Sequence, residues 1–403
     1  MIMAMKESGI EWVGLIPDDW KIAKNNRLFN ISKQLVNENW KNTQLLSLTK
    51  SGIIEKNIND GGGKQPESFG TYQYVEKDDI VLCLFDIDVS AVFSDRSKYD
   101  GMISPAYRVM KCTDAILPVY AKWWFDAVNI GRYYLIYTKS LRKTIDADGF
   151  GNILTVVPPL SEQQAIANYL DETCSKIDEI IAEAKTSIDE YKKLKIGQIN
   201  KYTVHKMKRT KLKYITEKIG DGIHTTPEYS DEGTIRFING GSFGEDSIKM
   251  IGPMLSNEEY QKQNKSLLNE HTVMIALNGA NFGNTSLYNN ETILLGKSAG
   301  YITLKPTVCR EYVRYCLENS VTKEAFDLSL NGTTIPNLSL NTLRNTEICL
   351  PDYSIQKQLA KTIKKMIVKM DSLIAEKKSL INDLEAYKKS LIYEVVTGKR
   401  RVV

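Results

Sequence analysis

One long helical pattern occurs twice in this sequence, and the repeat constrains the fold more than any other feature. The stretch from Ser161 to Lys206 returns, 193 residues later and without a gap, as Ser354 to Lys399. The tripeptide Ile-Ala-Glu occurs at 181–183 and again at 374–376. The other identical pairs include Ser161/Ser354, Gln163/Gln356, Ala167/Ala360, Asp178/Asp371, Ile188/Ile381 and Ile199/Ile392. A repeat of this length indicates two related halves, each ending in one such helix.

The repeat also divides the chain into segments. A chain of 403 residues is longer than one hydrophobic core usually supports, so more than one domain is expected. We expect two globular domains and two helical segments, the second helical segment including the C-terminal tail. The globular domains are 1–157 and 207–349, and the helical segments are 158–206 and 350–403.

Both globular segments show the same order of short strand-like runs and one helix. In the first segment, β-like runs at 79–85 and 106–110 precede a predicted helix at 119–130. The corresponding stretches of the second segment are 271–277, 299–304 and 312–318. The pattern repeats while the residues differ, which predicts an α+β fold for both domains, with a common scaffold and two different surfaces.

The two helical segments carry apolar stripes with three-and-four spacing, which is typical of a coiled coil. At the first helix, Ser161 is the predicted N-cap, Gln164 completes a capping box and Leu160 is available for a hydrophobic staple. The predicted stripe of the first helix is Ile166, Leu170, Ile177, Ile181, Ala184, Ile188, Tyr191 and Ile199. That of the second is Leu359, Ile363, Met366, Met370, Leu373, Leu380, Leu384, Tyr387 and Leu391, interrupted by Lys377.

The length of these helices predicts that they pair with each other. About 46 residues at 1.5 Å each would reach roughly 69 Å, which is longer than a domain of this size. We therefore expect the two helices to pair antiparallel, with a pseudo-twofold axis, and to act as a spacer between the two globular domains.

Composition and cysteine usage exclude several protein classes. No apolar run approaches the length of a membrane span, and residues 1–7 lack the features of a signal peptide, so we expect a cytoplasmic protein. The six cysteines show no Cys-x-x-Cys spacing, which argues against a zinc site or a disulfide framework. The net charge of +4 is too small to indicate a nucleic-acid partner by itself.

Motifs of common catalytic chemistry are absent from the sequence. There is no Gly-x-x-x-x-Gly-Lys-Ser/Thr phosphate loop and no Asn/Asp-Pro-Pro-aromatic tetrapeptide of amino-methyltransferases. Glu183/Lys185 and Glu376/Lys378 have the spacing of a nuclease metal site, but they fall on the long helices. Three histidines, His205, His224 and His271, are too few for a cluster. We therefore expect no catalytic residue and no metal site in this chain.

Several short stretches, in this order along the chain, resemble the DNA-specificity subunit of Type I restriction-modification systems. The stretch 157–167 (VPPLSEQQAIA) is similar to the family's entry into its central conserved helix. The stretches 350–356 and 391–399 are similar to its distal counterpart. Residues 8–20 are similar to its amino-terminal signature, and 101–107 (GMISPAY) to a common stretch of its target-recognition domains.

This resemblance implies a non-catalytic, sequence-specific DNA-binding subunit. Each globular domain would be a target-recognition domain that reads one half of a bipartite, asymmetric double-stranded DNA target. The helices would set the spacer and dock two methyltransferase (modification) subunits, and restriction subunits would join the complex. The resemblance implies no cofactor on this chain, with S-adenosylmethionine, ATP and Mg²⁺ bound by the partner subunits only.

Candidate DNA-contacting residues are polar side chains in turn-like stretches, because Arg, Lys, Asn and Gln commonly read base edges and Lys, Arg, Ser and Thr contact phosphates. In the first domain they are Lys64, Gln65, Arg96, Lys98, Tyr99 and Arg142. In the second they are His224, Thr225, Asn278, Asn281, Asn284, Lys297, Asn331 and Thr333.

Two other functions are compatible with parts of the sequence. A structural or adaptor protein could use the two-helix coiled coil to bridge ligands other than DNA, and it would show no salt-dependent duplex binding. A self-sufficient methyltransferase or nuclease would need the catalytic motifs that the sequence lacks.

Overall fold

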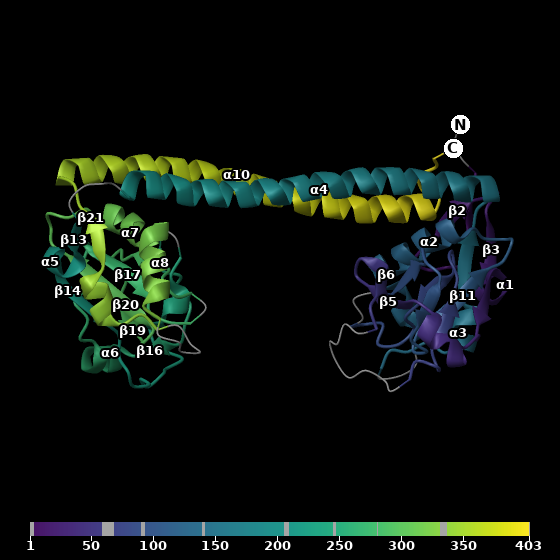
Figure 1. Cartoon of the computed structure of the whole chain (residues 1–403), viewed down its shortest axis with the longest axis horizontal. Helices are drawn as coiled ribbons and strands as arrows, with labels where there is room; N and C mark the ends of the chain where they lie inside the picture. Colours follow the sequence, from purple (N-terminus) through teal and green to yellow (C-terminus); the bar gives the residue numbers. More distant parts are fainter. Residues whose placement is uncertain are drawn as a thin grey trace. The chain divides into compact units, whose positions relative to one another are not determined.

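A computed structural model of the chain describes residues 4–58, 68–89, 93–138, 142–204, 209–244, 247–279, 281–330 and 337–402. The chain forms two compact units (Figure 1). Unit 1 consists of Met1–Ala184 and Ser379–Val403, and unit 2 of Lys185–Lys378. Each unit therefore contains a globular part and one segment from each of the two long helices.

Unit 1 is built on two four-stranded sheets. The first has the order β4-β11-β8-β9 and is antiparallel; the second has the order β6-β5-β10-β7, with β5 and β10 parallel. Two strand pairs, β1-β2 and β3-β12, complete the unit. The strands are β1 (Met5–Glu7), β2 (Leu15–Pro17), β3 (Lys21–Lys24), β4 (Phe29–Ser32), β5 (Leu45–Thr49), β6 (Gly52–Lys56), β7 (Gln73–Val75), β8 (Ile80–Leu82), β9 (Ser94–Arg96), β10 (Gly101–Ile103), β11 (Arg108–Cys112) and β12 (Leu154–Val157). The helices of its globular part are α1 (Asn25–Leu28), η1 (Asn37–Asn42), α2 (Pro118–Gly131), η2 (Tyr133–Tyr137) and α3 (Ala147–Asn152).

Unit 2 has the same plan. Its main sheet has the order β14-β20-β17-β18, its second sheet the order β16-β15-β19 with β15 and β19 parallel, and β13 pairs with β21. The strands are β13 (Arg209–Lys211), β14 (Thr216–Asp221), β15 (Ile235–Ile238), β16 (Met254–Leu255), β17 (Thr272–Ala276), β18 (Thr285–Leu287), β19 (Ile293–Leu295), β20 (Ala299–Leu304) and β21 (Glu347–Cys349). The helices are α5 (Leu212–Ile215), η3 (Gly240–Ser242), α6 (Asn257–Gln263), α7 (Arg310–Glu318), α8 (Ser320–Leu328) and α9 (Leu340–Asn345).

The equivalence of the two units confirms the predicted α+β fold and extends the repeat through the globular parts. In the main sheets, β4, β11, β8 and β9 correspond in order to β14, β20, β17 and β18. The helix predicted at 119–130 is α2, and the one predicted at 312–318 lies within α7. Trp123 and Trp124 are buried in α2 and belong to the core of unit 1.

The long helices are α4 (Leu160–Thr203) and α10 (Tyr353–Val396), of 44 residues each. The predicted N-cap at Ser161 is wrong: α4 already begins at Leu160, and the Pro159 carbonyl accepts the backbone N–H groups of Glu162 and Gln163. The Gln164 side chain donates to Asn168 Oδ1 instead of closing a capping box. Because the chain leaves β12 through Pro158-Pro159, the helix starts two residues earlier than the Ser-x-x-Gln pattern suggests.

The predicted stripe of α4 is confirmed, while that of α10 is wrong in part. All predicted positions of α4 are buried except Tyr191, which is half-buried. In α10, Leu380 and Tyr387 are exposed, whereas Ile367, Ile381 and Val395 are buried. The buried seam of α10 follows that of α4 at the same offset of 193: Gln356, Ala360, Ile363, Ile367, Met370, Ile374, Lys377, Ile381, Leu384, Lys388, Leu391 and Val395, buried or half-buried. The apolar face of α10 includes the buried seam and a second, more exposed row of residues beside it. The predicted stripe followed this second row over part of its length.

A buried glutamine joins each long helix to its globular unit. In unit 1, Gln163 Nε2 donates to the carbonyls of Ala115 and Pro158, and its Oε1 accepts the N–H of Leu117, the N-cap of α2. In unit 2, Gln356 Nε2 donates to the Pro351 carbonyl and its Oε1 accepts the N–H of Cys309, the N-cap of α7. Both side chains satisfy backbone groups that would be costly to bury unpaired.

Within each unit, the segments of α4 and α10 run in opposite directions and are joined by an equivalent ion pair. In unit 1, Asp178 pairs with Lys388 at 2.7 Å, and Glu162, earlier in α4, pairs with Arg401 just beyond α10. In unit 2, Lys195 pairs with Asp371 at 3.0 Å, and the later Ile199 shares a core cluster with the earlier Ile363. The two lysines and the two aspartates are each separated by 193 residues, so the same pair occurs once in each unit.

None of the described helices is long and apolar enough to cross a membrane.

Candidate nucleic-acid interface

Six of the predicted DNA-contacting residues of unit 2 meet at one rim of its main sheet. β14 and β17 are parallel to each other because both pair antiparallel with β20, and Asp221 and Ile275 lie opposite the same residue, Gly300. Three segments therefore lie at the same edge of the sheet: the residues that follow β14, the residues that follow β17 and the residues that precede β20. We call this surface the unit 2 rim; its members are His224, Thr225, Asn278, Asn281, Asn284 and Lys297.

The loop between β17 and β18 carries the three asparagines of the rim. Gly279 and Gly283 adopt positive φ angles of 79° and 75°, which allow the loop to turn tightly. The N–H of Asn284 donates to the Asn281 carbonyl, and the Asn284 carbonyl accepts the N–H of Ala276. Asn278 and Asn281 are half-buried and Asn284 is exposed, so the described part of the loop presents several amides to solvent.

The other members of the unit 2 rim are exposed side chains. His224 Nε2 lies 2.8 Å from Asp221 Oδ2, which orients the imidazole at the end of β14. Thr225 and Lys297 are exposed. Asn331 and Thr333 lie outside the described residues, as do Lys64 and Gln65 of the first domain.

The predicted residues of unit 1 divide between two ends of β8. Arg96 pairs with Ile80 at the amino end of β8, its guanidinium lies 3.2 Å from Asp78 Oδ1, and the exposed Lys98 and Tyr99 follow it. Arg142 lies beyond the carboxyl end of β8, where its carbonyl accepts the N–H of Asp86 at 3.0 Å. The structure therefore does not gather these four residues at one rim, and only Arg142 lies at the end equivalent to the unit 2 rim.

Sequence reasoning missed polar residues of both rims. In unit 2, Ser298 Oγ accepts the N–H of Gly240 and donates to Asn239 Oδ1, which brings the β15 loop to the rim. In unit 1, Lys33 follows β4 and Arg108 begins β11, and both line a cavity of about 510 Å³. Each lies at or next to an observed strand end. Only Ser298 flanks a strand predicted from the sequence, the run at 299–304, so the sequence carried a signal for Ser298 but not for Lys33, which follows a strand that was not predicted.

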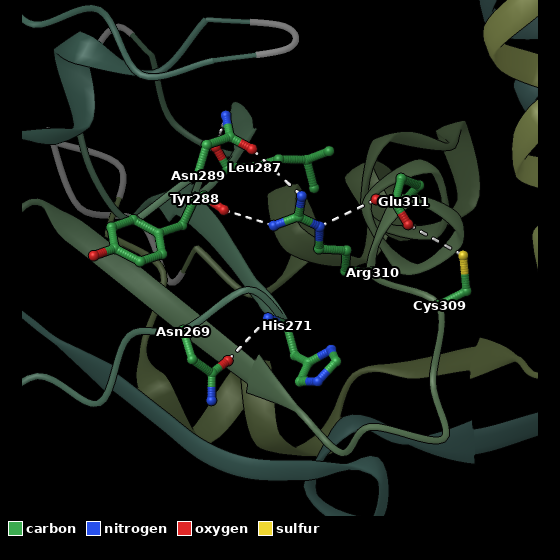
Figure 2. A network of polar contacts seen from close by, with 8 residues as sticks. All are labelled: Asn269, His271, Leu287, Tyr288, Asn289, Cys309, Arg310 and Glu311. Atoms are coloured by element: carbon green, nitrogen blue, oxygen red, sulfur yellow. Dashed lines mark hydrogen bonds and ion pairs between the residues drawn. The ribbon is translucent and has the colours of Figure 1, made fainter. Parts of the chain in front are cut away.

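Figure 2 shows a second polar cluster of unit 2, which has a structural role. The guanidinium of Arg310, at the start of α7, donates to the Tyr288 carbonyl at 2.6 Å, to Asn289 Oδ1 at 3.3 Å and to Glu311 Oε1 at 3.1 Å. These bonds fasten the turn after β18 to α7. The backbone N–H of His271 donates to Asn269 Oδ1 at 2.9 Å. The guanidinium is already engaged by three acceptors, so we assign it to the fold.

Three of the cysteine thiols are unsuited to nucleophilic chemistry. Burial raises the pKa of Cys309 to about 11 and that of Cys112 to about 12. Burial likewise raises the pKa of Cys174 to about 11. Thiols with such raised pKa values stay protonated near neutral pH and react poorly. Within the described part of the chain, no group of three or more His, Cys, Asp or Glu side chains could hold a metal ion.

Comparison with known proteins gives a consistent result. Residues 194–383 match the family described as Type I restriction modification DNA specificity domain. The Type I restriction enzyme MjaVIII specificity subunit of Methanocaldococcus jannaschii is 24% identical over 308 residues, which cover 67% of this chain and 70% of that protein.

Two solved structures share the fold. A chain from the structure reported as "Structural basis underlying complex assembly and conformational transition of the type I R-M system" aligns with 96% of this chain and 99% of its own length, with a TM-score of 0.77 and 13% identity. The HsdS subunit from Thermoanaerobacter tengcongensis aligns with 96% of this chain and 98% of its own length, with a TM-score of 0.57 and 13% identity.

The family match, the specificity-subunit relative and the common fold agree with the duplicated α+β units and their polar rims. The chain belongs to the specificity subunits of Type I restriction-modification systems, the non-catalytic subunits that recognise the DNA target within the restriction-modification complex.

Proposed function

We propose that each unit reads one half of a bipartite, asymmetric target in double-stranded DNA. The observation that carries this proposal is that equivalent sheet rims bear different polar groups. The unit 1 rim has Lys33, Arg108 and Arg142, whereas the unit 2 rim is dominated by asparagines. Guanidinium and ammonium groups favour guanine and amides favour adenine, so the two rims suit different base sequences.

In this proposal the recognition and spacer functions are carried by different segments. Residues 1–157 and 207–349 are the target-recognition domains. Residues 158–206 and 350–403 form the spacer, whose two helices fix the non-specific gap between the half-sites. Because the same seam and the same ion pair occur in both units, the frame is symmetric while the rims are not.

The helix pair also offers two equivalent apolar patches for partner subunits. Trp123 of α2 donates to Asp171, which shows that this edge of α4 faces the globular part of unit 1. The opposite edge, the outer edge, carries Ile180 and Tyr387 in unit 1, 44% and 46% exposed. Their repeat equivalents in unit 2 are Leu373 and Leu194, of which Leu194 is 48% exposed.

The ion pairs between α4 and α10 fix the register of the two helices and so indicate that the two residues of each patch lie side by side. Ile180 lies two residues after Asp178 in α4, and Tyr387 lies one residue before Lys388 in the antiparallel α10, so both are at the same level of the helix pair. The same relation holds for Leu194 and Leu373 around the Lys195–Asp371 pair. Two equivalent apolar patches suit two copies of one partner, and we assign them to two methyltransferase subunits.

The remaining chemistry belongs to the partner subunits in this proposal. S-adenosylmethionine is bound by the methyltransferase subunits, and ATP and Mg²⁺ are bound by the restriction subunits. Action on genomic DNA places the complex in the cytoplasm.

Lengthening both helices by one turn is expected to lengthen the DNA spacer. Duplicating Ile181–Ala184 in α4 and its equivalent Ile374–Lys377 in α10 adds four residues to each helix and keeps an isoleucine toward the seam. One turn is about 6 Å, which corresponds to one or two base pairs at roughly 3.4 Å each. Long-read methylation mapping, in a host carrying the variant with its partner subunits, should show the unchanged half-sites with a longer gap.

The unsubstituted chain mapped in the same host is the control for this experiment. Altered half-site bases with an unchanged gap would show that the helices do not set the spacer and would refute this division of roles.

A further inference from the structure

We propose that unit 2 contains a phosphate site for the DNA backbone, in a cationic cavity between its globular part and its own segments of α4 and α10. The site rests on the DNA-binding function above and adds a backbone contact to the rim. The cavity measures about 730 Å³. The described residues that line it include six cationic side chains, Lys192, Lys195, Lys249, Arg314, Lys323 and Lys378, and two carboxylates, Glu318 and Asp371.

The two carboxylates are matched by two of the cations. Lys195 pairs with Asp371 at 3.0 Å, and Arg314 pairs with Glu318 at 3.1 Å. Of the rest, Lys192 pairs with Asp189 on its own helix. Lys249, Lys323 and Lys378 are exposed, and the described part of the chain places no carboxylate within ion-pair distance of them. With respect to the described residues, these three ammonium groups are therefore open to an anionic ligand.

The equivalent cavity of unit 1 shows that the fold does not require these three lysines. There, Lys388 pairs with Asp178, as Lys195 does with Asp371, and Lys122 of α2 pairs with Asp126 at i+4, as Arg314 does with Glu318. That cavity is lined by two lysines and three aspartates, the third being Asp171. The paired charges therefore belong to the common frame, whereas Lys249, Lys323 and Lys378 have no lysine counterpart among the described residues that line the unit 1 cavity.

The cavity is continuous with the unit 2 rim, which selects the phosphodiester backbone as its ligand. Asn281 and Asn284 of the rim also line the cavity, and their amides can donate to phosphate oxygens. Gly241 and Gly244 line the same wall. A duplex read at the rim would thus bring its phosphates to the lysines, and the flexible ammonium groups suit phosphates as point charges.

The test compares two triple variants of the full-length chain. Lys249→Gln/Lys323→Gln/Lys378→Gln removes the free charges of the cavity. Lys361→Gln/Lys365→Gln/Lys369→Gln removes the same charge from exposed positions of α10 outside the cavity. Binding of a fluorescein-labelled random-sequence duplex is measured by anisotropy over a salt series. We expect the cavity variant to bind at least tenfold more weakly at low salt, and its salt slope to fall by roughly 0.9 for each phosphate contact removed.

Three further measurements decide between explanations. The matching Lys→Arg triple variant should retain binding, and thermal melting should show that all variants fold.

A cavity variant that binds as tightly as the α10 control, while the unsubstituted chain shows steep salt dependence, would overturn the phosphate site alone. An unsubstituted chain without salt-dependent binding would overturn the DNA-binding function with it. Displacement of the duplex by inorganic phosphate at constant ionic strength would indicate a free-anion pocket instead and would overturn the phosphodiester assignment.

Discussion

Replacing Glu162 by alanine is expected to destabilise unit 1 by about 3 kcal/mol, because this buried carboxylate joins three parts of the unit. Its oxygens accept Arg401 Nε at 2.7 Å and Nη2 at 2.6 Å, and the indole N–H of Trp20 at 2.9 Å. Trp20 is fully buried, so its N–H would lose its acceptor in the core. Arg401 keeps Asp19 at 2.8 Å and is a quarter exposed, which moderates the loss. Glu162→Gln should cost less, about 1 to 2 kcal/mol, since an amide oxygen can still accept from Trp20.

Tryptophan fluorescence measures how Glu162→Ala changes the stability of unit 1 separately from unit 2. All five tryptophans, Trp12, Trp20, Trp40, Trp123 and Trp124, belong to unit 1. Urea unfolding followed at the indole emission therefore reports unit 1 alone. The repeat supplies a matched control, since the equivalent of Glu162 is Ile355, which is 41% exposed. Ile355→Ala should leave the midpoint nearly unchanged. An equally small change for Glu162→Ala would show that the tail and the N-terminal segment are not held by this carboxylate.

Placing a glutamate on each outer-edge patch is expected to abolish assembly with the methyltransferase subunits. Leu194→Glu and Tyr387→Glu are equivalent by the repeat, and both side chains are about half exposed, so the chain should fold normally. A carboxylate buried in an apolar contact costs several kcal/mol, which corresponds to a loss of affinity of roughly 100-fold or more at each patch. Each single variant should bind one methyltransferase subunit, and the double variant none.

Native mass spectrometry of the reconstituted complexes counts the bound subunits directly. Gln358→Glu adds the same charge at an exposed position of α10 outside the seam and the outer edge, and should retain both partners. The double variant should still bind duplex DNA, because its substitutions lie away from the rims. Full assembly of the double variant would place the partners on another surface.

Much of the fold could be predicted because its signal is the repeat itself. The offset of 193 located both long helices and matched β8 with β17 and β11 with β20, since equivalent positions must bury the same seam and the same strands. Where the prediction of α10 was wrong, the cause was also physical. Leu359, Met366, Leu373, Leu380 and Tyr387 widen its apolar face, and periodicity alone cannot distinguish the seam from that outer edge. Applying the offset to the α4 stripe would have selected Ile374 and Ile381, which belong to the seam, in place of Leu373 and Leu380.

The candidate interface could be predicted less well, because it depends on contacts between strands distant in sequence. The unit 2 residues come together through β20, which sets the ends of β14 and β17 at the same level. In unit 1, Arg96 and Arg142 both lie in turn-like stretches, yet the antiparallel pairing of β8 with β9 places Arg96 at the other end of the sheet. Composition of a turn does not reveal which end of a sheet the turn occupies.

The measurement that tests the central proposal most directly is a methylation map of the unsubstituted system. The chain is expressed with its partner subunits in a host that lacks other adenine methyltransferases, and methylated adenines are located by long-read sequencing. Two different rims on a symmetric frame predict a single motif with two unlike half-sites and a gap of fixed length. A continuous motif, or a palindromic one with identical halves, would contradict the account.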